Sequence, residues 1–286
     1  MDISQNYEKY HTHISSKHKF FDLKLKEVWQ YRDLIWLNTK RFFTVQYKQT
    51  VLGPAWLFIN PIISSLIYAF VFGGIAGMST DKIPPMLFYL SGNAMWTFFS
   101  GCLTKNATTF TANAGVFGKV YFPRLTIPIS NAMASIIQYG IQFLIVVAFF
   151  IFYIATGQAM PNWPYLWLIP VTLIHLGLMG MGIGIIISSM TTKYRDLTVL
   201  VGFGVSLLMY ASPVVYPLSQ IKQGWMQTII MINPVTMPFE LYRYGLCGVG
   251  SVNWLYYGIS WVFTIIVVVF GIMVFNKVER TFMDTV

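Results

Sequence analysis

Long apolar stretches alternate with short polar segments along the chain from about residue 55 onward. A hydrocarbon core about 30 Å thick needs about 20 apolar residues of helix to cross it. Stretches of that length predict membrane spans at residues 55–77, 86–104, 125–153, 165–190 and 254–275. A further apolar stretch, residues 197–211, is short for a span. We therefore predict an all-α integral membrane protein with six transmembrane helices.

The region between the fifth and sixth predicted spans is apolar but interrupted by proline. Four prolines divide it: Pro213, Pro217, Pro234 and Pro238. Its longest uninterrupted piece, residues 225–232, is less than half a span. We expect two short re-entrant helices within residues 213–247, which require a protein cover for the broken backbone. An amphipathic loop lying on the membrane is the alternative.

The first 54 residues contain no apolar stretch long enough to span a membrane. Over residues 26–48, basic and aromatic side chains alternate in a way that suits an amphipathic helix lying in the membrane interface. We predict a cytoplasmic tail and an interfacial helix over residues 1–54, followed by a six-span domain over residues 55–286. The first span then acts as its own insertion signal.

Composition and charge agree with a membrane protein. Hydrophobic residues make up 56% of the chain and charged residues only 10%, against about 25% charged in soluble domains. The formal charge of +9 follows the predicted topology, because 16 of the 19 Lys and Arg fall on the cytoplasmic side if the N-terminus is inside. Only Lys82, Lys222 and Arg243 fall outside. We expect both termini in the cytoplasm, contact with anionic lipid, and no nucleic-acid partner.

Ionisable residues are nearly absent from the predicted spans. His175 is the exception, and we interpret it as a hydrogen-bonded packing residue and not as a proton relay. The chain also lacks a G-x-x-x-x-G-K-[ST] phosphate-binding loop. We expect no catalytic residue, no metal and no cofactor on this chain. Uphill transport would then need ATP and Mg²⁺ bound by a partner ATPase subunit.

Uncharged polar residues form a stripe on one face of the third predicted span. The stripe consists of Asn131, Ser135, Gln138 and Gln142, spaced i, i+4, i+7 and i+11. Such a stripe either joins helices through hydrogen bonds or lines a hydrated conduit, and both interpretations stay open. Small residues predict close helix packing at Gly177, Gly180, Gly184 and Ser188 in the fourth span and at Gly73 and Gly77 in the first.

Aromatic residues gather near the predicted outer ends of the spans. Most are typical of the aromatic belt at a membrane interface, but a ring with a polar tip can also stack on the face of a sugar. The candidate sugar contacts are Tyr210, Tyr216, Trp225 and Tyr242.

Basic residues cluster before the turn that leads into the first span. Lys40, Arg41 and Lys48 precede the corner at Leu52 and Gly53 and could hold a phosphate group at the bilayer edge. A simple lipid-anchoring helix is the alternative interpretation.

A series of short motifs resembles the membrane permeases of ABC exporters that move lipid-linked polysaccharides, the O-antigen and teichoic-acid branch. The likeness covers nearly the whole chain and rests on the order and spacing of the motifs together. The motifs are Arg32-Asp33-Leu34, Tyr47-Lys48-Gln49-Thr50-Val51-Leu52-Gly53, Trp56, Asn60-Pro61, Tyr194-Arg195-Asp196-Leu197, Ser212-Pro213-Val214-Val215-Tyr216-Pro217 and Asn233-Pro234.

The resemblance implies a homodimer of six-span subunits in a bacterial inner membrane, each docked to a nucleotide-binding ATPase subunit. It implies export of an undecaprenyl-diphosphate-linked polysaccharide, with O-antigen as the first choice of glycan. Leu52 and Gly53, with Gln49 in the same motif, would form the cytoplasmic gate near the lipid diphosphate. Residues 106–124 look like the coupling helix that receives the ATPase, with an ordinary cytoplasmic loop as the alternative. The coupling residues would be Asn113, Gly115, Val116, Phe117, Gly118 and Lys119.

Other functions stay open at this point. A teichoic-acid or capsule exporter has the same architecture, and a drug or simple-lipid ABC exporter would be distinguished by a large outer domain, which the sequence does not contain. A membrane-embedded glycosyltransferase needs carboxylates at the inner face. Only Asp33 and Asp196 are available there, each next to an arginine. A non-catalytic scaffold would predict no transport defect on deletion.

Overall fold

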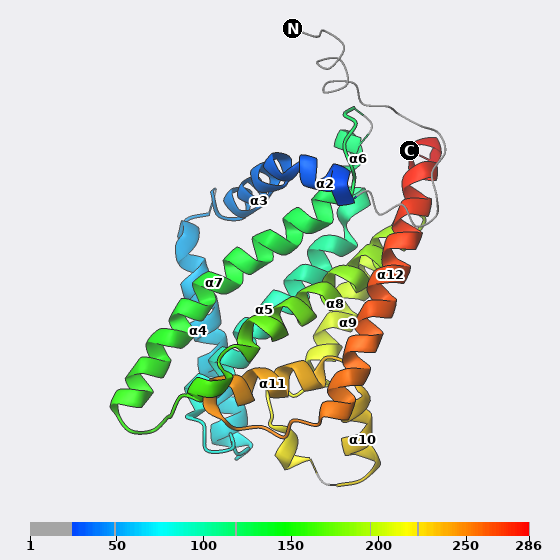
Figure 1. Cartoon of the computed structure of the whole chain (residues 1–286). Coiled ribbons are helices and arrows are strands. Elements are labelled where there is room, and N and C mark those ends of the chain that lie inside the picture. The colour runs from blue at the N-terminus through cyan, green and yellow to red at the C-terminus, as the bar shows by residue number, and fades with distance from the viewer. Residues whose placement is uncertain (1–24, 49, 118, 195, 222, 286) are drawn as a thin grey trace, which may run out of the picture.

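The structure is a computed structural model that describes residues 25–48, 50–117, 119–194, 196–221 and 223–285. Within these residues the regular secondary structure is helical, and the long helices run side by side in an inclined bundle (Figure 1). The helices are α2 (Leu25–Gln30), α3 (Arg32–Tyr47), α4 (Trp56–Tyr68), α5 (Pro85–Ala107), α6 (Thr109–Phe117), α7 (Thr126–Ala155), α8 (Leu168–Thr191), α9 (Leu197–Tyr210), α10 (Trp225–Ile232), α11 (Thr236–Cys247) and α12 (Trp254–Thr285). Short helical turns lie at η1 (Gly53–Ala55), η2 (Ala69–Ile75), η3 (Trp163–Tyr165) and η4 (Leu218–Gln220).

Four helical stretches of the described chain are long and apolar enough to cross a membrane. They are Gly53–Ile75, Thr126–Ala155, Trp163–Thr191 and Trp254–Glu279. These stretches correspond to the first, third, fourth and sixth predicted spans. The predicted spans at residues 86–104 and 197–211 are the helices α5 and α9, and their crossing of the membrane stays a prediction.

Helix α5 is long enough to span a membrane, but it is more polar than the four apolar stretches. Its 23 residues extend over about 34 Å at 1.5 Å per residue. The helix packs against α4, α7, α8 and α9, and most of its side chains are buried, including Asn93 and Asn106. A helix enclosed by other helices can carry amides that would be costly against lipid. Burial inside the bundle therefore explains the low hydropathy of α5.

Small residues on α8 allow α5 and α12 to approach it closely on two sides. A Cβ atom at Gly184 would lie 2.6 Å from the carbonyl oxygen of Leu103 on α5. On the other side, a Cβ at Gly271 of α12 would lie 2.9 Å from the oxygen of Gly182. The predicted packing face of the fourth span is thus confirmed. The predicted face in the first span is wrong at Gly77, where a Cβ would contact nothing within 4 Å and φ is +63°.

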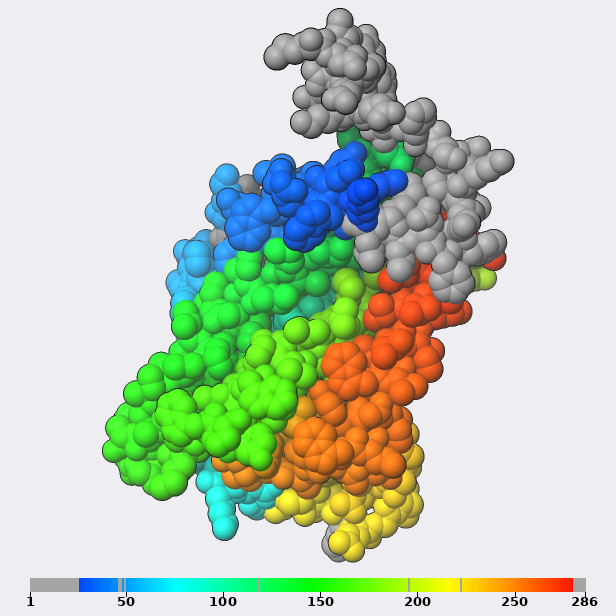
Figure 2. All heavy atoms as spheres, in the orientation of Figure 1, coloured from blue at the N-terminus to red at the C-terminus, as the bar shows by residue number. Residues whose placement is uncertain are grey.

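The remaining elements gather at the two ends of the bundle (Figure 1). The α3 end carries α3, α6 and the last turns of α12, and the α11 end carries α10 and α11. Figure 2 shows α7, α8 and α12 side by side on one face, with α3 lying across the end of α7. Helix α3 is held on α7 because Thr39 Oγ1 lies 3.4 Å from the Ser130 carbonyl and Ser130 Oγ lies 3.2 Å from the Ile35 carbonyl.

The prediction of two short helices between the fifth and sixth spans corresponds to α10 and α11. These two helices differ in their surroundings. Helix α11 is buried from Thr236 to Tyr242 and packs against α8, whereas α10 has no buried residue. A loop lying wholly on the membrane surface does not describe α11. Whether either helix enters the bilayer stays a prediction.

Candidate functional site

A hollow of about 670 Å³ lies at the α11 end, between the last turn of α9 and the first turn of α10. It contains three of the four aromatic residues predicted as sugar contacts: Tyr210, Tyr216 and Trp225. Two amides, Gln220 and Gln223, line the same hollow. Trp225 is 73% exposed, so its ring is available to a ligand. Aromatic faces beside amide groups are a combination that suits carbohydrate, since rings stack on sugars and amides bond to hydroxyls.

The fourth predicted sugar contact, Tyr242, is wrongly placed by the sequence. Its side chain is 0% exposed, and its hydroxyl lies 3.3 Å from the hydroxyl of Tyr139 on α7. Tyr242 is on the buried face of α11, where it joins α11 to the bundle. The spacing of aromatic residues did not reveal that α11 turns this face inward.

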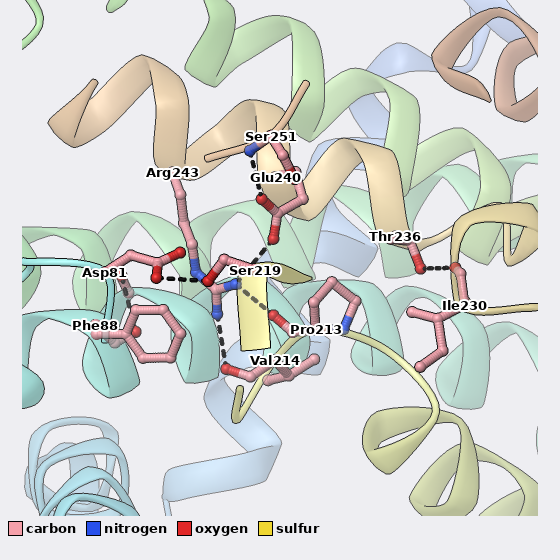
Figure 3. A network of polar contacts seen from close by, with 11 residues as sticks. Asp81, Phe88, Pro213, Val214, Ser219, Ile230, Thr236, Glu240, Arg243 and Ser251 are labelled. Atoms are coloured by element: carbon pink, nitrogen blue, oxygen red, sulfur yellow. Dashed lines mark hydrogen bonds and ion pairs between the residues drawn. The ribbon is translucent and has the colours of Figure 1, made fainter. Parts of the chain in front are cut away.

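A buried ionic network joins α11 to the segment that follows α9 (Figure 3). The Arg243 guanidinium donates to the carbonyl oxygens of Pro213 and Val214, the second at 2.8 Å. It also lies 3.6 Å from the carboxylate of Glu240 and 3.9 Å from the ring centroid of Phe88 on α5. Arg243 thus holds three elements together and does not act as a surface charge.

The Glu240 carboxylate belongs to the same network. Both Glu240 and Arg243 are almost fully buried, and Glu240 accepts a hydrogen bond from the backbone N–H of Ser251 at 3.1 Å. Burial raises the pKa of the Glu240 carboxyl, and the charge of Arg243 offsets only part of this rise. Nearby, Ser219 Oγ donates to Asp81 at 2.6 Å and ties the turn before α5 to this region. The network fixes the arrangement of the α11 end.

The polar stripe on α7 separates into two parts. Asn131 Nδ2 lies 3.2 Å from the Asn106 side-chain oxygen and from the Lys105 carbonyl, so this residue joins α7 to α5. Ser135 is buried and bonds to the Asn131 carbonyl of its own helix. Gln138 and Gln142 instead line a cavity between α4, α5 and α7.

Four further polar residues line this cavity and were not predicted from the sequence as site residues: Asn60, Ser64, Asn93 and Thr97. Trp56, Asn60 and Ser64 follow one another at four-residue spacing in the first predicted span, which places them on one helix face. That spacing is the signal that could have revealed Asn60. Asn93 and Thr97 show the same spacing on α5.

The predicted gate residues lie along α3 and the turn that follows it. Three of them are exposed: Lys40, Arg41 and Lys48. At helical spacing, these three side chains point into an arc of about 100° around the helix axis. Lys40 Nζ lies 5.2 Å from the centroid of the Trp36 ring. Gly53 has φ +52°, a conformation that side chains with a Cβ rarely adopt. Gln49 lies outside the described residues.

The predicted coupling segment corresponds to α6 and the residues after it. Gly115, Val116 and Lys119 are exposed there. Phe117 is wrong as a contact residue, because it is only 3% exposed and packs against Phe110 and Phe122. It anchors α6 to the bundle. Gly118 lies outside the described residues.

A hollow of about 290 Å³ separates α3 from α6 and residues 120–122. It is lined by Arg41 from the predicted gate and by Asn113 and Val116 from the predicted coupling segment. The structure therefore brings the two predicted regions together at the α3 end. Asn113 also bonds to the Thr109 carbonyl at 2.8 Å, within its own helix.

Comparison with known proteins gives a family match over most of the chain. A family model described as ABC-2 type transporter matches residues 33–247. Two proteins of Klebsiella pneumoniae, both named O-antigen export system permease protein RfbA, are each 30% identical over 254 residues, which cover 88% of this chain and 94% of theirs. A protein of the same name from Myxococcus xanthus is 24% identical over 222 residues, covering 77% of this chain and 82% of its own length.

Proposed function

The chain belongs to the ABC-2 type transporter family, and from that premise we propose that it is the membrane subunit of an ATP-driven exporter of lipid-linked polysaccharide. The cargo is an undecaprenyl-diphosphate-linked glycan, O-antigen before teichoic acid or capsule, carried from the cytoplasm to the outer side of a bacterial inner membrane. One observation carries this choice of cargo. The chain aligns over 88% of its length with permeases named for O-antigen export.

The geometry of the α11 end supports a carbohydrate cargo. Tyr216 and Trp225 stand beside Gln220 and Gln223 around one hollow of about 670 Å³. This volume is within the range of about 300–1,000 Å³ that is typical of small-molecule sites. A hollow of aromatic rings and amides offers stacking and hydrogen bonds to a sugar.

The α3 end supports docking of a partner ATPase. Val116 is 40% exposed although it is apolar, and Gly115 and Lys119 are exposed beside it. Arg124 holds the end of this segment to α12, since its guanidinium donates to the Glu279 carbonyl at 2.6 Å and lies 3.7 Å from the Glu279 carboxylate. A force applied to α6 would therefore be transmitted to α7 and α12. The exporter would contain two copies of this chain and two ATPase subunits.

The energy source is tested by comparing two changes in one export assay. His175 is fully buried, and its ring stacks on Trp261 at 4.1 Å and bonds to Thr264 at 3.0 Å. We expect His175→Asn to keep at least about half of the export rate, because an amide can still hydrogen bond although it cannot titrate. Inactivating the phosphate-binding loop of the partner ATPase should abolish export. The measurement is lipid-linked glycan that reaches the outer leaflet, at matched protein levels.

The opposite pattern would contradict the proposal. Export that continues without ATP hydrolysis but stops in His175→Asn would indicate a carrier driven by an ion gradient. If deletion of the chain left the amount of outer-leaflet glycan unchanged, polysaccharide would not be the cargo of this protein.

The proposed gate makes a second prediction at Gly53. Its left-handed backbone costs about 1–2 kcal/mol for a residue with a Cβ, and no atom lies within 4 Å of the Cβ position. Gly53→Val should therefore alter the backbone of the turn without a steric clash, and we expect export to fall about fivefold or more. Gly53→Asn should lose less, because asparagine tolerates this conformation. Equal export by both variants, at normal protein levels, would show that the turn conformation does not matter.

A further inference from the structure

A polar cavity of about 180 Å³ lies between α4, α5 and α7. Each of the three helices contributes two polar side chains to it. They are Asn60 and Ser64 from α4, Asn93 and Thr97 from α5, and Gln138 and Gln142 from α7. Trp56, Leu57 and Pro61 complete the lining. We call this cavity the amide groove.

The amide groove lies near the middle of α7 and beside the first turns of α4. Gln138 and Gln142 follow the start of α7 by 12 and 16 residues, which places them about 18 and 24 Å along a helix about 45 Å long. Both α7 and the stretch that contains α4 are apolar enough to cross a membrane. Lipid chains offer no hydrogen bonds, so amides at this depth need a polar partner.

One amide in the groove has an unused hydrogen-bonding atom. Gln142 is only 4% exposed, and its Oε1 has no hydrogen-bond partner among the described residues. Gln138 differs, because its Oε1 accepts a hydrogen bond from Lys105 Nζ at 3.3 Å. A buried acceptor without a partner costs about 1–3 kcal/mol. A ligand hydroxyl that donates to Gln142 would offset this cost.

The chemistry of the lining favours a neutral ligand rich in hydroxyl groups. None of the described residues that line the groove is ionisable, so a metal ion would find no carboxylate there. The Lys105 ammonium contacts the lining at Gln138, whose Oε1 accepts its hydrogen bond. Carboxamides both donate and accept hydrogen bonds, as sugar hydroxyls do. The indole of Trp56 adds an aromatic surface at the edge of the groove. The volume is below the range of about 300–1,000 Å³ for drug-sized ligands and suits one sugar ring.

We propose that the amide groove binds one sugar unit of the exported glycan within the membrane, through its hydroxyls and the amides of Asn60, Asn93 and Gln142. The proposal rests on the proposed function and adds a binding site inside the bundle. This site is separate from the aromatic hollow at the α11 end. It would offer a sugar the hydrogen bonds that the surrounding hydrocarbon cannot provide.

The first test measures export by amide variants in cells that contain the complete exporter. In the double variant Asn60→Leu with Gln142→Leu, two hydrogen bonds to the sugar are lost at about 0.5–1.5 kcal/mol each. We expect the rate of glycan appearance in the outer leaflet, per folded exporter, to fall about tenfold. Asn60→Gln should restore most of the export that Asn60→Leu loses. Gln158→Leu makes the same chemical change at an exposed position in the turn after α7 and should stay within about twofold of wild type.

The second test identifies what occupies the groove. A photoreactive amino acid at position 60 is incorporated in cells that make the glycan, and the crosslinked product is probed with a glycan-specific antibody. We expect a glycan adduct that disappears when glycan synthesis is blocked. Crosslinks only to lipid or to a second copy of this chain would overturn the proposal, as would the absence of any adduct.

The two tests also separate this inference from the proposed function. If wild-type protein exports no glycan, then both the proposed function and the proposed sugar site are wrong. If wild-type protein exports glycan and the double variant exports it equally well, then only the sugar site is wrong. A double variant that lowers the melting temperature and leaves export per folded molecule unchanged would show that the amides serve only to join helices.

Discussion

Replacing Gly184 with valine is expected to prevent normal packing of α8 against α5. The Cβ atom alone would lie 2.6 Å from the Leu103 carbonyl oxygen and 2.7 Å from Asn106 Cβ. The first of these is a backbone atom in the central helix, so it cannot move aside as the end of a flexible side chain would. Overpacking of this kind typically costs about 1–3 kcal/mol and occasionally more. We expect a loss of at least about 3 kcal/mol, seen as a strong decrease in membrane-inserted protein and in the melting temperature in detergent.

The matched control is Gly140→Val on α7. No atom outside its own helix lies within 4 Å of a Cβ at Gly140, so the same chemical change there causes no clash, and valine is a slightly better helix former than glycine. We expect Gly140→Val to keep its melting temperature within a few degrees of wild type. If Gly184→Val and Gly140→Val had the same stability, the close approach of α8 and α5 would be wrong.

Replacing Arg243 with methionine is expected to disrupt the α11 end. The change leaves the Pro213 and Val214 carbonyls without their donor and leaves Glu240 buried without its cation. Breaking one side of a buried ion pair costs about 3–5 kcal/mol. We expect a fall in the free energy of unfolding of that size. We also expect faster proteolysis of residues 211–217, because Arg243 binds the Pro213 and Val214 carbonyls of this segment.

Removing both charges separates the ionic part of this effect. In the double variant Glu240→Gln with Arg243→Met, no unpaired charge is left, and the glutamine can still accept from the Ser251 N–H. We expect the double variant to be more stable than Arg243→Met alone. The control Lys277→Met removes an exposed charge and should change stability by less than about 0.5 kcal/mol. If the double variant were no more stable than Arg243→Met, the ion pair with Glu240 would not be the reason that Arg243 stabilises the α11 end.

The same network explains an exception to the predicted charge distribution. Arg243 is one of three basic residues that the sequence assigns to the outer side, against the general preference for basic residues in the cytoplasm. The structure shows that it is a buried residue which binds backbone carbonyls. A count of basic residues treats every arginine as a surface charge. It therefore could not distinguish Arg243 from the exposed residues of α3.

The polar stripe on α7 shows how far a pattern within one helix can be interpreted. Its spacing correctly placed four residues on one face, but two uses of that face were equally compatible with the sequence. The structure assigns Asn131 to a contact with α5 and places Gln142 in the amide groove. The difference depends on residues of α4 and α5 that are 25 or more positions away in the chain. No periodicity within α7 contains that information.

The sequence by itself determined the features that depend on local composition and spacing. These are the long apolar helices, the proline-broken region that contains α10 and α11, the glycine face of α8 and the basic segments at the α3 end, because each follows from the membrane thickness or from helix geometry. Only the tertiary structure decided which face of each helix is covered. Burial of Tyr242 and Phe117, the ionic network of Arg243 and the meeting of Asn60, Asn93 and Gln142 all depend on neighbours distant in the chain. Such contacts are set by packing between helices, which the period of a single helix does not specify.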